Sequence, residues 1–443
     1  MTGDGDPANT PPRRRFLAGA ATALAATTAG CGYVPGGGDL TWREPLRVGS
    51  LAFDSDRWHL ATDDRLVVVE NQSGRTYDWE DEEWGEVENA AVSVLEPDGT
   101  VRSAGETERQ AVGSPAVGGG AVFVPVERGR VTAVDLSRDE SAGGSPAEGG
   151  TTGGGATDGP DDDAVRWRVD FASVSGGGES ETSGPALGGV RASGALAVAV
   201  GSRGIAAVDA ETGDRAFAVS DLWTDGSGRE PADLTLRVAV DGETVWALVP
   251  GIAAATGDGN ADAAIVGYDR GGNRRAERAV DAGHEWIAVV DGTVVAGAPG
   301  ASMSGYDPDL DRRFTLDVRA PNARSTAVQA GRGRLYYSRG RTVASVDVAR
   351  GEVAFEQSDL PQGNLAVDER GAYVAGIGRE RDAGTEARMA AVGVGGAVRW
   401  EAPFPDGVEP RELYAFGGRL VALDGDTAYG FRAVPGDRWS PLG

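Results

Sequence analysis

The chain has 443 residues, with 68 acidic and 42 basic side chains and a net charge of −26 at pH 7. This charge excludes nucleic acid as an expected partner, because its phosphate backbone would be repelled. The single cysteine excludes an intrachain disulfide, so the fold depends on packing and hydrogen bonds.

All 42 basic residues are arginine, since no lysine occurs in the chain. An acidic surface without lysine resembles that of proteins from extreme halophiles and implies a haloarchaeal source. At roughly 1 M salt the Debye length falls to about 3 Å, so such a surface no longer repels itself strongly.

The N-terminus has the layout of an export signal, a basic segment followed by a short apolar run over 18–29. Its pattern resembles the twin-arginine signal, and residues 1–30 are expected to form the signal peptide. The apolar run is too short for a convincing membrane span. The pattern is carried by Arg13, Arg14, Phe16 and Leu17.

The chain's one cysteine follows this run directly, in Thr28-Ala29-Gly30-Cys31. These residues resemble a lipobox, in which the cysteine is lipidated and becomes the mature N-terminus. We therefore expect Cys31 to anchor the protein to the outer face of the cell membrane, with 31–39 as lipidated cysteine and Gly-rich tether. A stray cysteine beside an ordinary cleavage site is the alternative.

From residue 40 onward a pattern of four short strands, A to D, recurs, and Ala195–Val219 shows it most clearly. Period-two alternation bounded by Gly, Asp and Pro predicts strands throughout. Strand C ends near an Asp, which is expected to accept hydrogen bonds from turn amides rather than to bind a ligand. These residues are Asp209, Asp269, Asp307 and Asp347.

Eight such units follow one another, and the eighth lacks its strand D. Leu40–Val48 resembles strand D of units two and seven, so it is expected to complete the last sheet and remove the open edge. The sequence thus predicts an all-β fold: an eight-bladed β-propeller over 40–436, closed by an N-terminal strand, with no helical domain. Seven blades are the alternative. The low-complexity insertion 137–163 is expected to be disordered.

The stretch VAVGSRGIAAVDAETGDRAF, residues 198–217, resembles the repeats of the pyrroloquinoline-quinone-like (PQQ-like) propeller family. The family includes quinone-dependent dehydrogenases, outer-membrane assembly scaffolds and members without an assigned activity. The dehydrogenases hold quinone and calcium in the central funnel, and many have a disulfide between adjacent cysteines. This chain has no cysteine for that bond and no matching cluster of Glu, Asn and Asp, so its layout is closer to the scaffold members, which are lipoproteins.

The two histidines, His59 and His284, stand at the start of strand A in units one and five, across the predicted ring from each other. A shared metal site is therefore not expected. Asp307-x-Asp309-x-Asp311 lacks the Gly and the distal Glu of a calcium loop. We predict no catalytic residue, no cofactor and no metal site.

The long insertions gather on the end of the ring that carries the B–C loops and the D–A connections, and loops there are candidates for recognition. Neutral drift in loop length is the alternative. They are Asn71–Asn89, Ala172–Gly184, Ser220–Asp233, Gly251–Asp262 and Gly378–Arg388. The candidate partner-binding residues are Tyr77, Trp79, Trp84 and Trp223. Trp79 and Trp84 folded back on the blade is the alternative to an exposed position.

Together these features predict a non-enzymatic extracytoplasmic lipoprotein that acts as a binding or assembly scaffold for a protein or polymer partner. The alternative is a quinone-dependent oxidoreductase, or another enzyme with its site in the propeller funnel.

Overall fold

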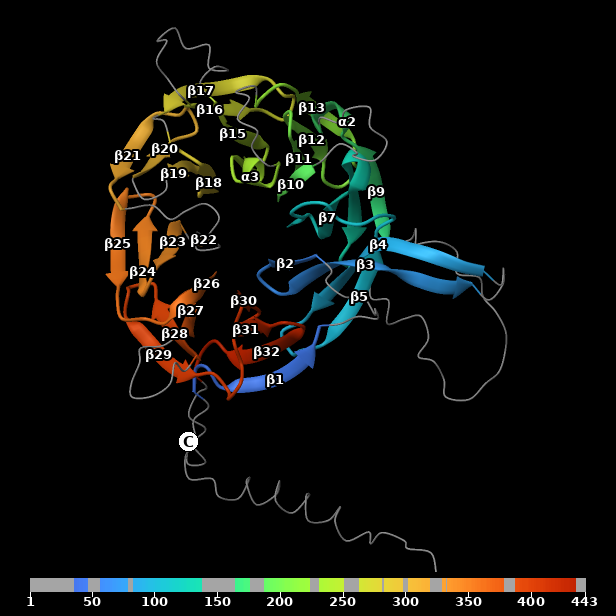
Figure 1. The fold of residues 1–443 in the computed structure, drawn as a ribbon. Coiled ribbons are helices and arrows are strands. Elements are labelled where there is room, and N and C mark those ends of the chain that lie inside the picture. Colours follow the sequence, from blue (N-terminus) through green and yellow to red (C-terminus); the bar gives the residue numbers. More distant parts are fainter. Residues whose placement is uncertain are drawn as a thin grey trace, which may run out of the picture.

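The fold was analysed in a computed structural model, which describes twelve segments of the chain. They are 36–46, 56–78, 83–137, 164–175, 187–223, 231–250, 263–280, 283–297, 302–318, 329–331, 333–377 and 387–435. Within them, eight four-stranded antiparallel sheets are arranged in a ring (Figure 1). The predicted eight-bladed β-propeller is therefore confirmed.

The first four blades follow the chain in order. Blade one is β2 (Arg57–Ala61), β3 (Leu66–Asp78), β4 (Glu83–Leu95) and β5 (Val101–Glu106). Blade two is β6 (Ala116–Gly118), β7 (Ala121–Val126), β8 (Arg130–Asp135) and β9 (Val165–Asp170). Blade three is β10 (Leu187–Ser193), β11 (Leu196–Gly201), β12 (Ile205–Asp209) and β13 (Arg215–Val219). Blade four is β14 (Val238–Asp241), β15 (Thr244–Pro250), β16 (Ala263–Tyr268) and β17 (Arg274–Val280).

The remaining blades complete the circle. Blade five is β18 (Trp286–Val290), β19 (Thr293–Gly297), β20 (Met303–Tyr306) and β21 (Arg312–Leu316). Blade six is β22 (Gln329–Gly331), β23 (Arg334–Arg339), β24 (Thr342–Asp347) and β25 (Glu352–Gln357). Blade seven is β26 (Gln362–Asp368), β27 (Gly371–Ile377), β28 (Ala387–Gly393) and β29 (Val398–Pro403). Blade eight is β30 (Glu412–Phe416), β31 (Arg419–Asp424), β32 (Thr427–Arg432) and β1 (Leu40–Pro45).

Helices are short where the structure describes the chain: η2 (Glu127–Gly129), α2 (Ala172–Ser175) and α3 (Pro231–Thr235). None of these described helices has the length and hydropathy of a membrane span. The sheets thus carry the fold, as predicted.

The middle strands of each blade are buried on both faces, because the next blade packs against each side. Every residue of β7, β11 and β16 is buried, which explains why these strands are continuous apolar runs. The core consequently consists of clusters shared by neighbouring blades. Val198 and Val200 of blade three, for example, pack with Val245 and Val266 of blade four.

An aromatic residue on strand D of one blade packs on the C–D turn of the next. The indole of Trp167 lies on Gly213, where a Cβ would stand 2.7 Å from the ring, and its Nε1 donates to the carbonyl of Ala210 at 3.1 Å. Gly213 has φ +76°, a left-handed conformation that glycine adopts without strain. The same packing joins Phe217 to Gly272, Phe314 to Gly351 and Phe355 to Gly396.

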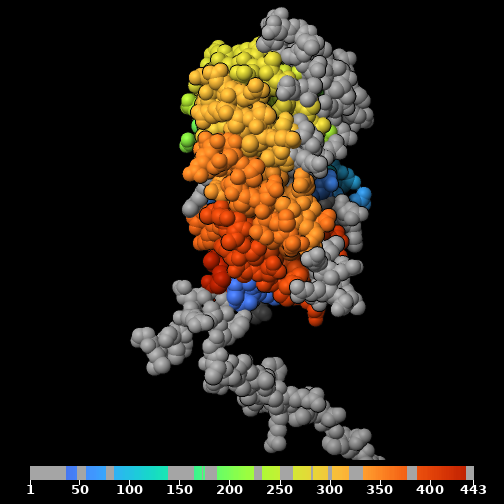
Figure 2. All heavy atoms as spheres, turned by 90° about the vertical axis from the view of Figure 1, so that its left-hand side faces the viewer, coloured from blue at the N-terminus to red at the C-terminus, as the bar shows by residue number. Residues whose placement is uncertain are grey.

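The N-terminal strand closes the ring, as predicted. β1 pairs antiparallel with β32 and so becomes strand D of blade eight. Figure 2 shows the N-terminal segment, in blue, against the C-terminal blade in red. Both chain ends of the described ring therefore meet in one blade.

Two ends of the ring can be distinguished by topology. The B–C turns and the D–A connections lie at one end, here named the B–C rim, because the strands of each blade are antiparallel. The A–B and C–D turns lie at the other end, named the C–D rim. On the C–D rim, Asp209, Asp269 and Asp307 accept hydrogen bonds from turn amides, as expected.

One prediction differs from the structure. Asn71–Asn89 was expected to be a loop, but β3 and β4 run on through most of it as 13-residue strands. They pair continuously from Leu66↔Leu95 to Asp78↔Glu83. Strand residues such as Val87, Thr76 and Tyr77 favour this pairing despite the glycines and acids around them.

Candidate functional site

The extension of β3 and β4 forms the most prominent projection from the described ring. We call residues 72–78 and 83–89 the arm; it runs from the B–C side of blade one past the perimeter of the ring (Figure 1). β2 pairs with β3 only as far as Glu70, and β5 pairs with β4 only as far as Ala91. Beyond these residues, the described part of the arm has no third strand.

Buried polar contacts hold the base of the arm. Asn71 is only 7% exposed, and its amide donates to the carbonyl of Ala111 at 2.9 Å and accepts from the N–H of Ala111 at 2.7 Å. The N–H of Ala90 donates to Oγ1 of Thr107, which is fully buried, at 2.9 Å. Because paired buried polar groups favour one arrangement, these contacts fix the direction in which the arm leaves the blade.

One face of the arm combines aromatic and charged residues. Residues opposite each other in the register share a face, which places Arg75 with Glu86, and Trp84 is on the same face as Glu86, two residues before it. The side chain of the candidate Tyr77 lies outside the described part of the structure. The side chain of Trp84 is 65% exposed, so it does not fold back into the blade. Arg75 and Glu86 form an exposed ion pair at 3.5 Å, which contributes little to stability.

Trp223, the other candidate, is not brought together with the arm. Its ring packs against the core between blades three and four, and its Nε1 donates to the carbonyl of Gly201 at 3.1 Å. This tryptophan therefore has a packing role in the structure. The export and lipidation candidates Arg13, Arg14, Phe16, Leu17 and Cys31, together with Trp79, lie outside the described residues.

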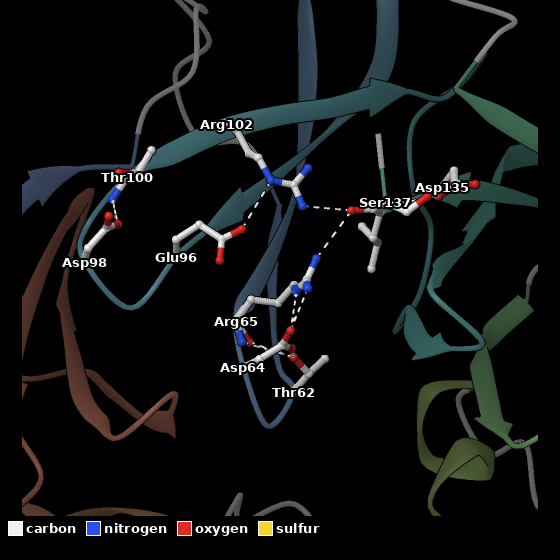
Figure 3. Close-up of polar contacts among 10 residues, drawn as sticks. Thr62, Asp64, Arg65, Glu96, Asp98, Thr100, Arg102, Asp135 and Ser137 are labelled. Atoms are coloured by element: carbon white, nitrogen blue, oxygen red, sulfur yellow. Dashed lines mark hydrogen bonds and ion pairs between the residues drawn. The ribbon is translucent and has the colours of Figure 1, made fainter. Parts of the chain in front are cut away.

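A hollow of about 690 Å³ lies on the opposite rim, between the turns of blades one and two (Figure 3). Arg102 crosses it, donating from Nε to Glu96 at 3.2 Å and from Nη2 to the carbonyl of Leu136 at 2.7 Å. Arg65 also reaches this carbonyl, at 3.4 Å, and its hydrogen bond lowers the pKa of Asp64. These arginines connect the two blades.

A second hollow of about 690 Å³ lies beside it, between blades two and three. Arg166 donates to Asp135 at 2.9 Å and to the carbonyls of Gly119 and Gly120. Burial alone would raise the pKa of Asp135, but hydrogen bonds from Arg166 and Ser137 outweigh it and lower the pKa to about 2. The charged side chains of Arg166 and Asp135 therefore also form their contacts within the ring.

The histidines are separate, as expected. Nδ1 of His59 lies 3.0 Å from Oε2 of Glu412, which also accepts a hydrogen bond from the hydroxyl of Tyr414. Burial, reinforced by Glu412, raises the pKa of Tyr414. His284 is buried before β18 in blade five. Among the described residues no group of three or more His, Cys, Asp or Glu side chains is arranged to hold a metal ion.

Sequence reasoning did not foresee the contact between His59 and Glu412. These residues stand 353 positions apart and meet because blade eight closes against blade one. Both lie in the innermost strand of their blades: His59 is the third residue of β2, and Glu412 is the first residue of β30. The predicted position of His59 at the start of a strand A was the available signal.

Solved structures share this architecture. BamB from Moraxella catarrhalis aligns with a TM-score of 0.47 and 15% identity, over 86% of this chain and 98% of that chain. The C-terminal WD40 domain of Sif2 aligns with a TM-score of 0.52 and 9% identity, over 90% and 99%. No protein-family model and no curated protein matches the chain. At these identities the likeness concerns the propeller fold alone.

Proposed function

We propose that this protein is an extracytoplasmic, lipid-anchored scaffold, with PQQ-like repeats and without a catalytic task, that binds a protein partner through the arm. The observation that carries the proposal is the exposed Trp84 on a hairpin whose base is held by Asn71 and Thr107.

Physical reasons favour a binding role for the arm. A two-stranded hairpin with no third strand is marginally stable in water. An indole ring exposed to solvent does not contribute the free energy that its burial would provide, so exposed rings of this kind mark binding sites. The buried contacts of Asn71 and Ala90 nevertheless hold the arm in place. A preorganised element loses less conformational entropy on binding, so a partner would bind it more tightly than a free loop.

The proposed location rests on the sequence. The twin-arginine-like residues and Cys31, at the end of a short apolar run, support export followed by lipidation. The scaffold would then stand on the outer face of the cell membrane, where its acidic surface is suited to high salt.

The test compares two deletions in the tagged, full-length protein. In the first, 73–88 is replaced by Asn-Gly, a two-residue turn that joins the paired residues Gln72 and Asn89 and retains Asn71. In the matched control, 141–159 of the low-complexity insertion is removed. A photo-crosslinking residue at position 84 of the undeleted protein identifies the partner, and pull-down through the tag then measures how much of that partner each deletion variant captures.

We expect the first deletion to abolish capture of the crosslinked partner with little change in melting temperature, and the control deletion to retain capture. Capture that survives loss of the arm but is lost with 141–159 would contradict the proposal.

A further inference from the structure

At one edge of the arm, the backbone N–H and C=O groups of two acidic residues of β4 point away from β3. The N–H of Ala90 donates to Oγ1 of Thr107, and its carbonyl accepts from the N–H of Thr107 at 2.9 Å, so the backbone of Ala90 points away from β3. Backbone direction alternates along an antiparallel strand, and the β3–β4 register is continuous here. The N–H and C=O groups of Glu86 and Glu88 therefore point the same way.

This edge is open in the described part of the chain. β5 pairs with β4 from Leu95 to Ala91 and no further, and no other described strand pairs with β4 on that side. We call Glu86–Glu88 the β4 edge. An open edge offers a row of donors and acceptors to which another strand can pair.

The acidic side chains of the β4 edge determine which kind of strand can pair with it. Glu86 and Glu88 lie on the same face of the strand because they are two residues apart, and the side chain of Glu86 is 71% exposed. A second copy of this chain would set glutamate beside glutamate, which is unfavourable for directly opposed residues. A strand with Arg or Lys at alternate positions would instead place each cation beside a carboxylate.

The neighbouring aromatic ring fits the same partner. Trp84 lies two residues before Glu86, on the same face, and its ring is 65% exposed. A guanidinium or ammonium group over an indole face is attracted to it.

We propose that the β4 edge binds an extended cationic segment of the partner protein, which adds to the arm as a further strand. Main-chain hydrogen bonds to Glu86 and Glu88 would provide affinity, and their carboxylates would provide selectivity. This inference rests on the proposed function, since it names the chemistry of the segment that the arm binds.

The probe is a fluorescein-labelled peptide, Arg-Val-Arg-Thr-Arg-Val-Arg, titrated against the purified protein and followed by anisotropy. One control peptide replaces each Arg by Glu. A second keeps the sequence and charge but carries N-methyl groups on the main-chain nitrogens of its third and fifth residues, both Arg, whose N–H groups would otherwise donate to the β4 edge. We expect saturable binding of the first peptide and at least about tenfold weaker binding of both controls.

Two substitutions at one position separate charge from strand addition. Glu86→Gln removes the carboxylate and keeps the N–H, whereas Glu86→Pro also removes an N–H that faces away from β3 and so leaves the ladder with β3 intact. We expect the proline variant to bind about tenfold more weakly than the glutamine variant. The double variant Glu86→Arg/Glu88→Arg should prefer the Glu peptide.

Hydrogen exchange supplies the structural readout. On adding the Arg peptide, the amides of Glu86 and Glu88 should exchange more slowly, while those of Gly85 and Val87, which face β3, should not change. Equal binding of the N-methylated peptide, or unchanged exchange at Glu86 and Glu88, would overturn strand addition.

The outcomes separate this inference from the proposed function. If arm deletion abolishes capture of the partner but the Arg peptide does not bind, the cationic-strand proposal is rejected and the proposed scaffold function is retained. Binding of the Arg peptide with partner capture unaffected by arm deletion would support the edge chemistry and reject the arm as the scaffold's binding element.

Discussion

Nε1 of Trp42 donates a hydrogen bond of 3.0 Å to the carbonyl oxygen of Pro97. Trp42 belongs to the N-terminal strand of blade eight, and Pro97 belongs to the C–D turn of blade one. The ring of Trp42 also lies on Gly99 and on Gly430. One side chain thus joins the two ends of the blade array.

Replacing this side chain should weaken the whole ring. For Trp42→Ala we expect a loss of about 3 kcal/mol in the free energy of unfolding, since the indole packing and its hydrogen bond both disappear. Urea unfolding measures it, with Glu44→Gln on the same strand as the control. Deleting 40–46 should cost more, because it leaves β32 with an open edge. Unchanged melting after that deletion would mean that another contact closes the ring.

Gly213 should not accept a side chain. In Gly213→Ala the left-handed backbone costs about 1–2 kcal/mol, and the new Cβ would stand 2.7 Å from Trp167. We expect a lower melting temperature than for Gly242→Ala, which has a similar φ of +56° but nothing within 4 Å of the Cβ. Equal losses in the two variants would show that the backbone, and not the packing on Trp167, decides the effect.

Asp135 should contribute to stability in a defined pH interval. Its pKa falls from 3.8 to about 2 in the folded protein, so its contribution is present above about pH 4 and is lost as pH falls toward 2. The stability difference between the wild type and Asp135→Asn should therefore shrink over this interval. Unfolding at a series of pH values and constant salt measures it. Arg166→Gln, which removes a donor to Asp135, should narrow the interval; a difference independent of pH would contradict this account.

Cys31→Ser should release the protein from the cell surface into the medium. Each buried CH₂ of a lipid chain contributes about 0.8 kcal/mol to membrane binding, and the substitution removes the whole chain. Fractionation of cells and medium, followed by immunoblotting, measures the outcome. Arg13→Lys/Arg14→Lys should instead block export and keep the protein inside the cell. A substituted protein that remains at the membrane would contradict anchoring through Cys31.

The blades could be predicted because their pattern is local. In β12, four consecutive residues place apolar side chains between neighbouring blades, and Asp209, the fifth, then closes the strand by accepting hydrogen bonds from turn amides. Ring closure could also be predicted, since Leu40–Val48 repeats the pattern of strand D. Each of these patterns lies within about ten residues.

The arm could not be predicted as strands, because Gly74, Gly85 and several acids indicate a loop in sequence. Its structure depends on register with the blade below and on Asn71 and Thr107, which lie far apart in the chain. Likewise, the environment of His59 depends on Glu412 and thus on closure of the ring. Such contacts are set by topology and are absent from any local pattern.

If Cys31 carries the proposed lipid, the position of the start of β1 sets which rim of the ring faces the membrane. Leu40 pairs with Phe431 at the C–D end of blade eight, and Gly38 just before it donates to Arg432 and rests on Trp400. Gly36 stands five positions after Cys31, a reach of at most about 18 Å. A lipid on Cys31 would therefore hold the C–D rim toward the bilayer and turn the B–C rim, with the root of the arm, toward the cell's surroundings.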